Sequence, residues 1–231
     1  MSASLPPPFH KEVFTFLRQI RQHNERAWFD AHKPLYETAV RMPAFAFITA
    51  MGPRLATISP HFRAVAKKNG GSLMRIYRDL RFSKDKNPYK TNVGIQFRHE
   101  LGRDVHAPGY YLHLEPGRCF LGAGIWRPDS KALRKIRDFI ADNPGGWRKA
   151  VDDRRFRVRF VLDGESLVRA PRGYAPDHPL IDDLKRKDFI AIHDFADAKA
   201  LDDDFIDWVT GAYQTATPLM RYLCQALEVP F

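Results

Sequence analysis

Residues 110–126, which read YYLHLEPGRCFLGAGIW, decide the fold of this 231-residue chain. Apolar residues alternate with other residues on either side of Pro116 and Gly117, a pattern that predicts two strands joined by a turn. Residues 93–98, VGIQFR, show the same alternation shortly before them. Successive side chains of a strand point to opposite faces, so the three segments predict an antiparallel meander with one apolar and one mixed face.

Helical patterns flank this meander on both sides. Apolar residues recur at helical spacing over residues 9–20, and Pro43 is placed to open a longer helix that runs to residue 58. After the meander the sequence predicts helices over residues 130–142 and 205–227, a short helix that follows the loop of residues 172–180 and runs through Leu184, and strands over residues 155–162 and 189–193.

The predicted fold class is α+β, a largely antiparallel sheet with N-terminal helices and a C-terminal helix packed on one face and at one end. No linker, internal repeat or low-complexity tract divides the chain. We therefore expect residues 1–231 to form a single domain of unknown function, in which residues 1–60 are a helical layer and residues 61–231 are the sheet with its helices.

The chain is strongly basic, with a formal net charge of +10 and a pI near 9.7. Such a charge favours encounters with anionic partners, although it does not define a reaction. No apolar stretch approaches the length that spans a membrane, and residues 1–17 lack the apolar core of a secretory signal. We expect a cytoplasmic protein without membrane contact, and the sequence leaves its oligomeric state open.

The sequence holds no recognised cofactor or metal motif. Its nine histidines have no chelating spacing, and Cys119 and Cys224 are too few for an all-cysteine metal site. The phosphate-binding G-x-x-x-x-G-K-[ST] loop, the dinucleotide-binding G-x-G-x-x-G loop and the G-x-S-x-G of a serine nucleophile are all missing. We therefore expect no metal and no cofactor, assign no catalytic residue, and leave open whether the protein is an enzyme.

Charged residues are concentrated in residues 75–90, RIYRDLRFSKDKNPYK, where Tyr and Phe residues are interspersed with cations and carboxylates. The nearby Gly70–Gly71 and Asn87–Pro88 pairs favour a strand that ends in a structured loop. On such a strand Arg78 would point to the apolar side and need an ionic partner, because a buried unpaired guanidinium is costly. Arginine and lysine suit phosphate and carboxylate groups. The candidate ligand-binding residues here are Arg75, Arg78, Asp79, Arg81, Ser83, Lys84, Asp85, Lys86, Tyr89 and Lys90.

A pair of glycines indicates a second place of interest. Gly122 and Gly124 fall on one side of their strand, and Trp126 follows on that side. Glycines in a strand mark a close approach, made either by a helix that packs on them or by a ligand on a platform shared with Tyr111 and His113. Solvent access to Trp126 and His113 distinguishes these alternatives, and Trp126 joins the candidate ligand-binding residues.

His178 is the last candidate. It lies beside Asp177 and between two prolines, on a segment expected to be a loop. Loops carry function disproportionately, so His178 is a candidate for ligand binding or general acid–base chemistry, with loop bracing as the alternative.

The charged segment also resembles the signature of a known family. Its pattern R-x-x-R-D-x-R-F-S-x-D-K-x-P-Y-K is similar to that of a family of uncharacterised bacterial and fungal proteins, catalogued as a domain of unknown function. The G-x-G-x-W-x-P block at residues 122–128 and the P-x-G-Y block at residues 171–174 extend the resemblance over nearly the whole chain, while Leu80 and Ala123 depart from it. The resemblance implies family membership and supports the choice of residues, and it implies no reaction.

The favoured function is binding of a phosphate- or carboxylate-bearing small molecule in a basic pocket, with phosphate-ester chemistry as the reaction that best fits the charge if catalysis occurs. One alternative is a nucleic-acid-associated basic protein, because cations are interleaved with aromatic rings. Another is a non-enzymatic protein-interaction domain, in which the charged segment is a structural ion-pair network or a solvated face. Cations that converge on one concavity favour a small ligand, whereas a long basic stripe favours a polymer.

Overall fold

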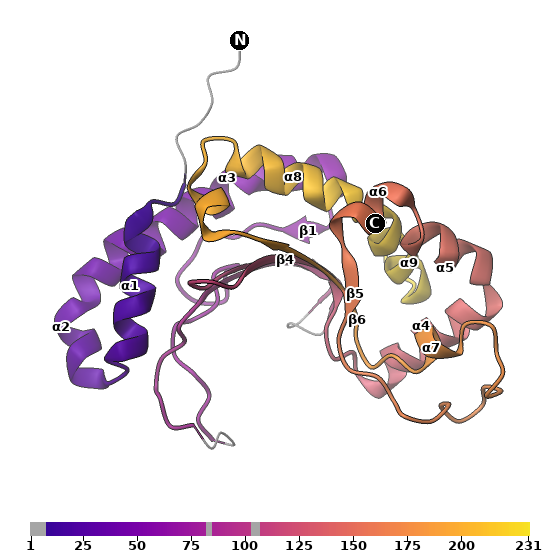
Figure 1. Ribbon diagram of the computed structural model, residues 1–231. Coiled ribbons are helices and arrows are strands. Elements are labelled where there is room, and N and C mark those ends of the chain that lie inside the picture. The colour runs from indigo at the N-terminus through magenta and orange to yellow at the C-terminus, as the bar shows by residue number, and fades with distance from the viewer. Residues whose placement is uncertain (1–7, 82–84, 103–106) are drawn as a thin grey trace, which may run out of the picture.

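The computed structural model describes residues 8–81, 85–102 and 107–231, so the candidates Ser83 and Lys84 lie outside the described residues. The described chain forms an arched sheet with helices over one face and at both ends (Figure 1). The opposite face is concave, and loops descend on either side of it. This arrangement leaves one face of the sheet for the core and the other for contact with something else.

Six strands make up the sheet within the described residues, in the order β1-β2-β3-β4-β6-β5, and all neighbouring pairs are antiparallel. They are β1 (Phe62–Arg63), β2 (Val93–His99), β3 (Gly109–Leu114), β4 (Cys119–Ile125), β5 (Val161–Asp163) and β6 (Phe189–Phe195). Gly117, with a φ of +80°, makes the tight turn between β3 and β4. The predicted three-stranded meander is confirmed as β2, β3 and β4.

The helices follow the predicted order, with a helical layer before the sheet and a helical pair after it. They are α1 (Lys11–Gln22), α2 (Arg26–Tyr36), a π-helical turn η1 (Glu37–Arg41), α3 (Met42–Ile58), α4 (Ser130–Asp142), α5 (Pro144–Val151), α6 (Arg154–Arg159), α7 (Ile181–Leu184), a 3₁₀ turn η2 (Asp197–Leu201), α8 (Phe205–Thr215) and α9 (Thr217–Ala226). The α+β class is therefore confirmed. Within the described ranges, no helix combines the length and the apolar composition needed to cross a membrane.

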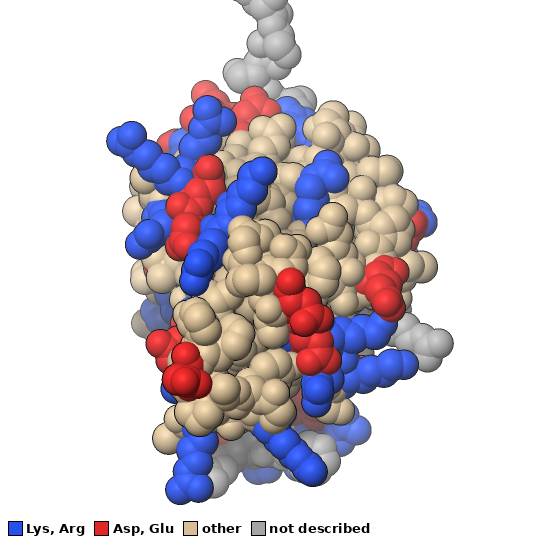
Figure 2. All heavy atoms as spheres, turned by 90° about the vertical axis from the view of Figure 1, so that its right-hand side faces the viewer, with Lys and Arg blue, Asp and Glu red and all other residues tan. Residues whose placement is uncertain are grey.

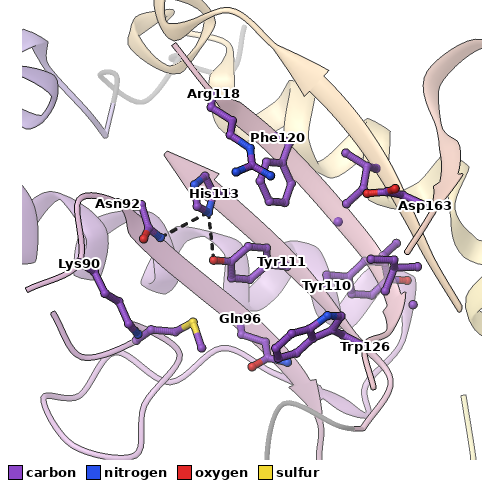
Figure 3. A pocket seen from close by; sticks show the side chains of 17 residues that line it. Lys90, Asn92, Gln96, Tyr110, Tyr111, His113, Arg118, Phe120, Trp126 and Asp163 are labelled. Atoms are coloured by element: carbon purple, nitrogen blue, oxygen red, sulfur yellow. Dashed lines mark hydrogen bonds between the residues drawn. The ribbon is translucent and has the colours of Figure 1, made fainter. Parts of the chain in front are cut away.

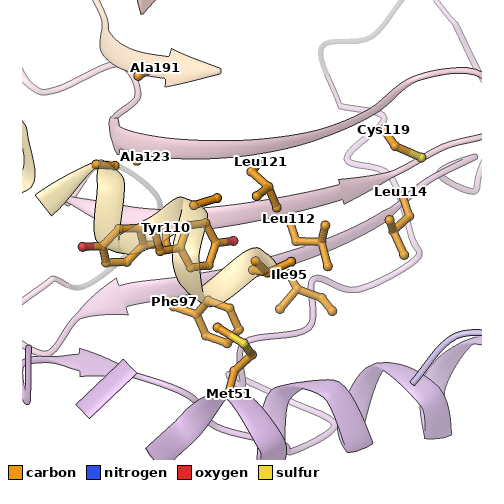
Figure 4. Close-up of a cluster of buried hydrophobic side chains, with 14 of the residues drawn as sticks. Met51, Ile95, Phe97, Tyr110, Leu112, Leu114, Cys119, Leu121, Ala123 and Ala191 are labelled. Carbon is orange, nitrogen blue, oxygen red and sulfur yellow. The ribbon is translucent and has the colours of Figure 1, made fainter. Parts of the chain in front are cut away.

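The hydrophobic core lies between the meander and the helices that pack on its other side from the concave face (Figure 4). Met51 of α3 and Tyr213 of α8 are fully buried there, and the Tyr110 and Tyr213 ring centroids are 4.6 Å apart. Burial of a large apolar side chain contributes about 1.5–3 kcal/mol, so this face is fixed in the core. The strand residues that point to it are Ile95, Phe97, Tyr110, Leu112, Leu114, Leu121 and Ala123.

One predicted element is wrong. Most of the strand expected over residues 155–162 is helix α6, and β5 is only three residues long. Asp153 caps this helix by accepting two hydrogen bonds from backbone amides of its first turn. The alternation in the sequence indicated a strand. In the structure Phe156 of the helix and Phe160 directly after it are buried with their ring centroids 5.6 Å apart, while Val158 between them is 78% exposed.

Candidate functional site

The face of the sheet turned away from the core carries a cavity of about 460 Å³ (Figure 3). A volume of this size is typical of small-molecule binding sites. Its floor is one row of residues that lie side by side because β2, β3, β4 and β6 pair in register. This row consists of Gln96, Tyr111, Gly122 and Ile192.

The glycines of β4 keep this floor open. A Cβ atom on Gly122 would lie 3.4 Å from the Cβ of Tyr111 and 3.8 Å from the Cδ1 of Ile192, so its nearest neighbours belong to the sheet. The interpretation that a helix packs on the glycines is therefore wrong. Gly124 has a φ of +130°, and a Cβ there would lie 2.0 Å from the carbonyl oxygen of Phe189, which no side chain tolerates.

A hydrogen-bonded chain of polar side chains lies along one part of the cavity. The Nδ1 atom of His113 is 3.2 Å from the hydroxyl of Tyr111 and 3.3 Å from the side-chain nitrogen of Asn92. The Nε2 atom of His113 is 3.3 Å from Oε2 of Glu115. Thr91 donates a hydrogen bond to the other oxygen of Glu115 at 2.9 Å. The imidazole is thus tied to a carboxylate behind it and to a phenol at the cavity.

Glu115 determines where the hydrogens of this chain lie. An ionised carboxylate only accepts, so Nε2 of His113 carries the hydrogen, and Nδ1 of the neutral ring accepts from Tyr111 and Asn92. Burial lowers the pKa of His113 below its usual range, with Glu115 opposing the shift. Burial also raises the pKa of Tyr111 to about 12. At neutral pH the imidazole is therefore uncharged and the phenol is protonated.

Two neighbours keep the chain in position. The Phe120 ring stacks on His113, with centroids 4.5 Å apart and an angle of 11° between the planes. Gly94, opposite His113 on β2, leaves room for the Tyr111 hydroxyl, because a Cβ atom there would lie 2.7 Å from this hydroxyl and 3.0 Å from the sulfur of Met74. A glycine at this position is needed for the observed place of the phenol.

Lys90 brings positive charge to the cavity wall (Figure 3). Its backbone amide donates to the carbonyl of Ile76 at 2.7 Å, which fixes the residue where the charged segment returns to the sheet. Burial lowers the pKa of the Lys90 ammonium, and the nearby Arg75 guanidinium lowers it further. Among the described residues no carboxylate pairs with Lys90. Arg118, exposed beside Phe120, supplies a second cation.

The other cations that the structure describes in residues 75–90 are not part of the cavity lining. Arg78 pairs with Asp85, and Arg81 pairs with Asp79 at 2.6 Å. The hydrogen bond from Arg81 lowers the pKa of Asp79 to about 2. The Arg78 side chain is 28% exposed, so its expected burial on an apolar face is wrong, while the expected carboxylate partner is present.

The backbone of this segment also differs from the prediction, since it folds back on itself outside the six strands. Tyr77 and Tyr89 form an isolated bridge. The Tyr89 ring is buried, and its centroid is 4.4 Å from that of Phe29 in α2, so it anchors the loop to the helical layer. Arg75 and Lys86 are exposed and do not line the cavity. Of the described candidates from this segment, the cavity lining includes Lys90 alone.

The two candidates outside this segment differ from each other. Trp126 lines the cavity and is 44% exposed, and the guanidinium carbon of Arg127 lies 4.8 Å from its ring centroid. The buried carboxylate of Asp188 accepts a hydrogen bond from the Arg127 backbone at 2.7 Å and so holds this turn. His178 is not part of the lining, and its Nδ1 accepts a hydrogen bond from the Leu180 backbone at 3.1 Å. The loop-bracing interpretation therefore describes His178.

Four polar residues of the cavity had no assigned role in the sequence. Gln96 lies on the mixed face that the alternation predicts, so a signal for it was present. Asn92 and Arg118 adjoin strand ends, and Asp163 ends the short strand β5, so only the tertiary fold brings them to this face. Within the described ranges, no three His, Cys, Asp or Glu side chains are placed to hold a metal ion.

Comparison with family models matches residues 12–222 to a family described as conserved hypothetical protein (DUF2461). The matched span includes the cavity lining, which runs from Met74 to Ile192. No curated protein matches the chain. The membership in a family of unknown function that the sequence implied is confirmed.

Proposed function

The chain belongs to the DUF2461 family of conserved hypothetical proteins, and from its geometry we propose that it binds a small molecule carrying a phosphate or carboxylate group. The binding site is the cavity on the concave face of the sheet. The family description assigns no reaction, so the proposal rests on the residues of this chain.

The half-buried ammonium group of Lys90 is the observation that carries this proposal. A charge removed from water is costly unless a counter-ion compensates it, and the described residues supply no carboxylate to Lys90. Most of the remaining lining is aromatic or aliphatic, including Trp126, Phe120 and Ile192. The cavity therefore suits an anionic group attached to an apolar or planar body.

A small ligand fits this arrangement better than a polymer. The cavity has a bounded volume, and Lys90 and Arg118 both line it. On the side drawn in Figure 2, Lys and Arg side chains are interspersed with Asp and Glu side chains and form no continuous stripe. Binding of a nucleic acid is favoured by an extended row of cations, which contacts successive phosphates of the backbone.

The proposal assigns no reaction to the bound molecule. Nδ1 of His113 already accepts hydrogen bonds from Tyr111 and Asn92, so the polar chain orients hydrogens and does not present a free base to the ligand. Hydrolysis of phenyl phosphate is measured alongside binding, because phosphate-ester chemistry is the reaction that the charge favours.

The test compares two lysines of the same loop. Phenyl phosphate and benzoate are titrated into wild-type protein by calorimetry, with uncharged benzamide as the comparison ligand. Lys90→Met should weaken binding of both anions by about tenfold or more, since a charge-assisted hydrogen bond is lost. Lys86→Met removes the same charge from an exposed position four residues away and should leave the affinity unchanged.

Two results would overturn the proposal. Equal losses in Lys90→Met and Lys86→Met would mean that net charge alone attracts the anions. Failure of the wild-type protein to bind either anion, or equal affinity for benzamide, would mean that the cavity is not an anion site.

A further inference from the structure

We propose that the ligand of this cavity is a mononucleotide whose base carries an exocyclic amino group, such as adenine or cytosine. This inference deepens the proposed function, because it assigns the anionic group to a phosphate and adds a recognised heterocycle. It follows from the hydrogen-bonding groups that remain unused on the cavity floor.

The floor has the form that a planar ring requires. Gly122 has no side chain, and the nearest side chains to the place of its absent Cβ are those of Tyr111 and Ile192. The Trp126 ring stands at the edge of this floor (Figure 3). Stacking of a base on an aromatic side chain contributes about 1–3 kcal/mol and works with any base. Shape alone therefore selects a planar body without selecting which one.

The hydrogen-bonded side chains around His113 determine which planar ring is preferred. Tyr111 gives its one hydroxyl hydrogen, and Asn92 one of its two amide hydrogens, to Nδ1 of His113, and each residue keeps an oxygen that can accept. These oxygens are the Tyr111 hydroxyl oxygen and Oδ1 of Asn92. Both residues line the cavity, so these two oxygens can accept hydrogen bonds from N–H groups of a ligand.

Gln96 adds a group that can both donate and accept. No hydrogen bond among the described residues engages its side-chain amide, which lies on the floor beside Tyr111. An amide of this kind pairs with the adjacent donor and acceptor on the edge of adenine, and an amino-substituted pyrimidine offers the same combination. A base with a carbonyl in place of the amino group would set an acceptor against the Tyr111 oxygen, whose hydrogen is already given to His113.

Lys90 then holds the phosphate. It lines the wall near Asn92, and Figure 3 shows Gln96 and Tyr111 between Lys90 and Trp126. A ligand with the base over Gly122 and the phosphate at Lys90 therefore reaches all of these groups. This mode needs neither of the glycine-rich phosphate loops, which the sequence lacks.

The decisive test uses pairs of nucleotides that differ at the amino position. Adenosine and inosine 5′-monophosphates form one pair, cytidine and uridine 5′-monophosphates form the other, and ribose 5-phosphate and phenyl phosphate serve as references. By calorimetry the amino member of each pair should bind at least about tenfold more tightly than its carbonyl partner. Both amino nucleotides should also bind more tightly than ribose 5-phosphate.

Three variants separate the contributions of the groups. Gln96→Met should weaken the amino nucleotides and their carbonyl partners alike, because its amide can turn to pair with either edge, and should leave the phenyl phosphate affinity unchanged. Lys90→Met should weaken all the phosphates while preserving the ratio within each pair. Trp126→Phe should abolish most of the quenching of tryptophan fluorescence by the bound base. Thermal unfolding of each variant checks that the fold is retained.

The outcomes distinguish this inference from the proposed function. Equal affinities within both pairs, or ribose 5-phosphate binding as tightly as the amino nucleotides, overturn the nucleotide inference. If phenyl phosphate still binds and still depends on Lys90, the anion site stands. Absence of binding by every phosphate overturns the nucleotide inference, and absence of binding by benzoate as well overturns the proposed function too. Binding of a single-stranded oligonucleotide without any mononucleotide overturns the nucleotide inference in favour of a polymer.

Discussion

The charged loop of residues 75–90 and the concave face of the sheet differ in whether their cations are paired with carboxylates. In the loop, Arg78 and Arg81 are paired with carboxylates of the same loop, and the Arg81 side chain is exposed. At the cavity, Lys90 is half-buried with the Arg75 guanidinium nearby, and no described carboxylate pairs with it. A high density of charge in the sequence therefore indicates where cations and carboxylates neutralise one another. Whether a cation is available to bind a ligand depends instead on its burial and on the absence of a carboxylate partner.

The difference in pairing between the two regions has a structural reason. The loop carries its own Asp79 and Asp85 within reach of its arginines, so local spacing is enough to satisfy them. Lys90 is placed by the backbone hydrogen bond to Ile76 and by the edge of β2 that follows it. The sheet, with Gly122 at its floor, provides the concavity that the loop lacks.

The largest expected effect comes from filling the floor. Gly122→Leu should abolish binding of phenyl phosphate, because the leucine side chain would extend into the cavity over Tyr111 and Ile192. Gly122→Ala should retain part of the affinity, since its Cβ would make an ordinary contact of 3.4 Å with Tyr111. Calorimetry on both variants measures this difference. Wild-type affinity in Gly122→Leu would show that the anion binds elsewhere, with the charged loop as the first place to look.

The second effect concerns the position of the phenol. Gly94→Ala should lower the free energy of unfolding by about 1–3 kcal/mol, because its Cβ would collide with the Tyr111 hydroxyl and the Met74 sulfur. Urea unfolding followed by circular dichroism gives the value. Gly145→Ala is the matched control, since nothing lies within 4 Å of the added Cβ in helix α5. An equally small effect of both substitutions would mean that Tyr111 is free to shift.

Much of this organisation could be predicted from the sequence, and the missing part has a physical cause. Alternation in residues 93–98 and 110–126 predicts which side chains face the core and which share the mixed face with Gly122, because strand periodicity is a local property. The choice of Lys90 from the six cations of its loop could not be predicted in this way. Its burial and lack of a carboxylate depend on how β2 and the returning loop meet in space, which is a tertiary property.

The same distinction explains the two wrong elements. The alternation over residues 155–162 is typical of a strand. Most of the segment nevertheless forms a helix, because Asp153 accepts hydrogen bonds from the backbone amides of the first helical turn. The loop of residues 75–90 has strand-like spacing. Leu73, just before it, bridges to Ile95 of β2, whereas the bridge within the described part of the loop joins Tyr77 to Tyr89.

The third prediction follows from the protonation of His113. Burial lowers its folded-state pKa below the usual value of 6.5, with Arg118 adding to the shift, Glu115 opposing it, and the neutral Tyr111 and Asn92 facing Nδ1. As the pH falls through about 6.5, the unfolded chain takes up a proton that the folded chain does not, so His113 reduces stability below that pH until its folded-state pKa is reached. His113→Gln should therefore lose stability less steeply than wild type below about pH 6.5. Urea unfolding at a series of pH values measures the two slopes, and parallel curves would contradict the burial of the imidazole.

The smallest effect is expected in the charged loop. Asp79→Asn breaks the pair with Arg81, yet both side chains are largely in water, where ion pairs are screened and contribute little. The unfolding midpoint and the phenyl phosphate affinity should both stay at their wild-type values near neutral pH. An affinity loss as large as that of Lys90→Met would mean that the paired loop orients the anion, and the contrast between the two regions would then fail. A loss in stability alone would instead show that the loop ion pairs brace the wall on which Lys90 stands, which leaves the anion site in place and gives the loop its structural role.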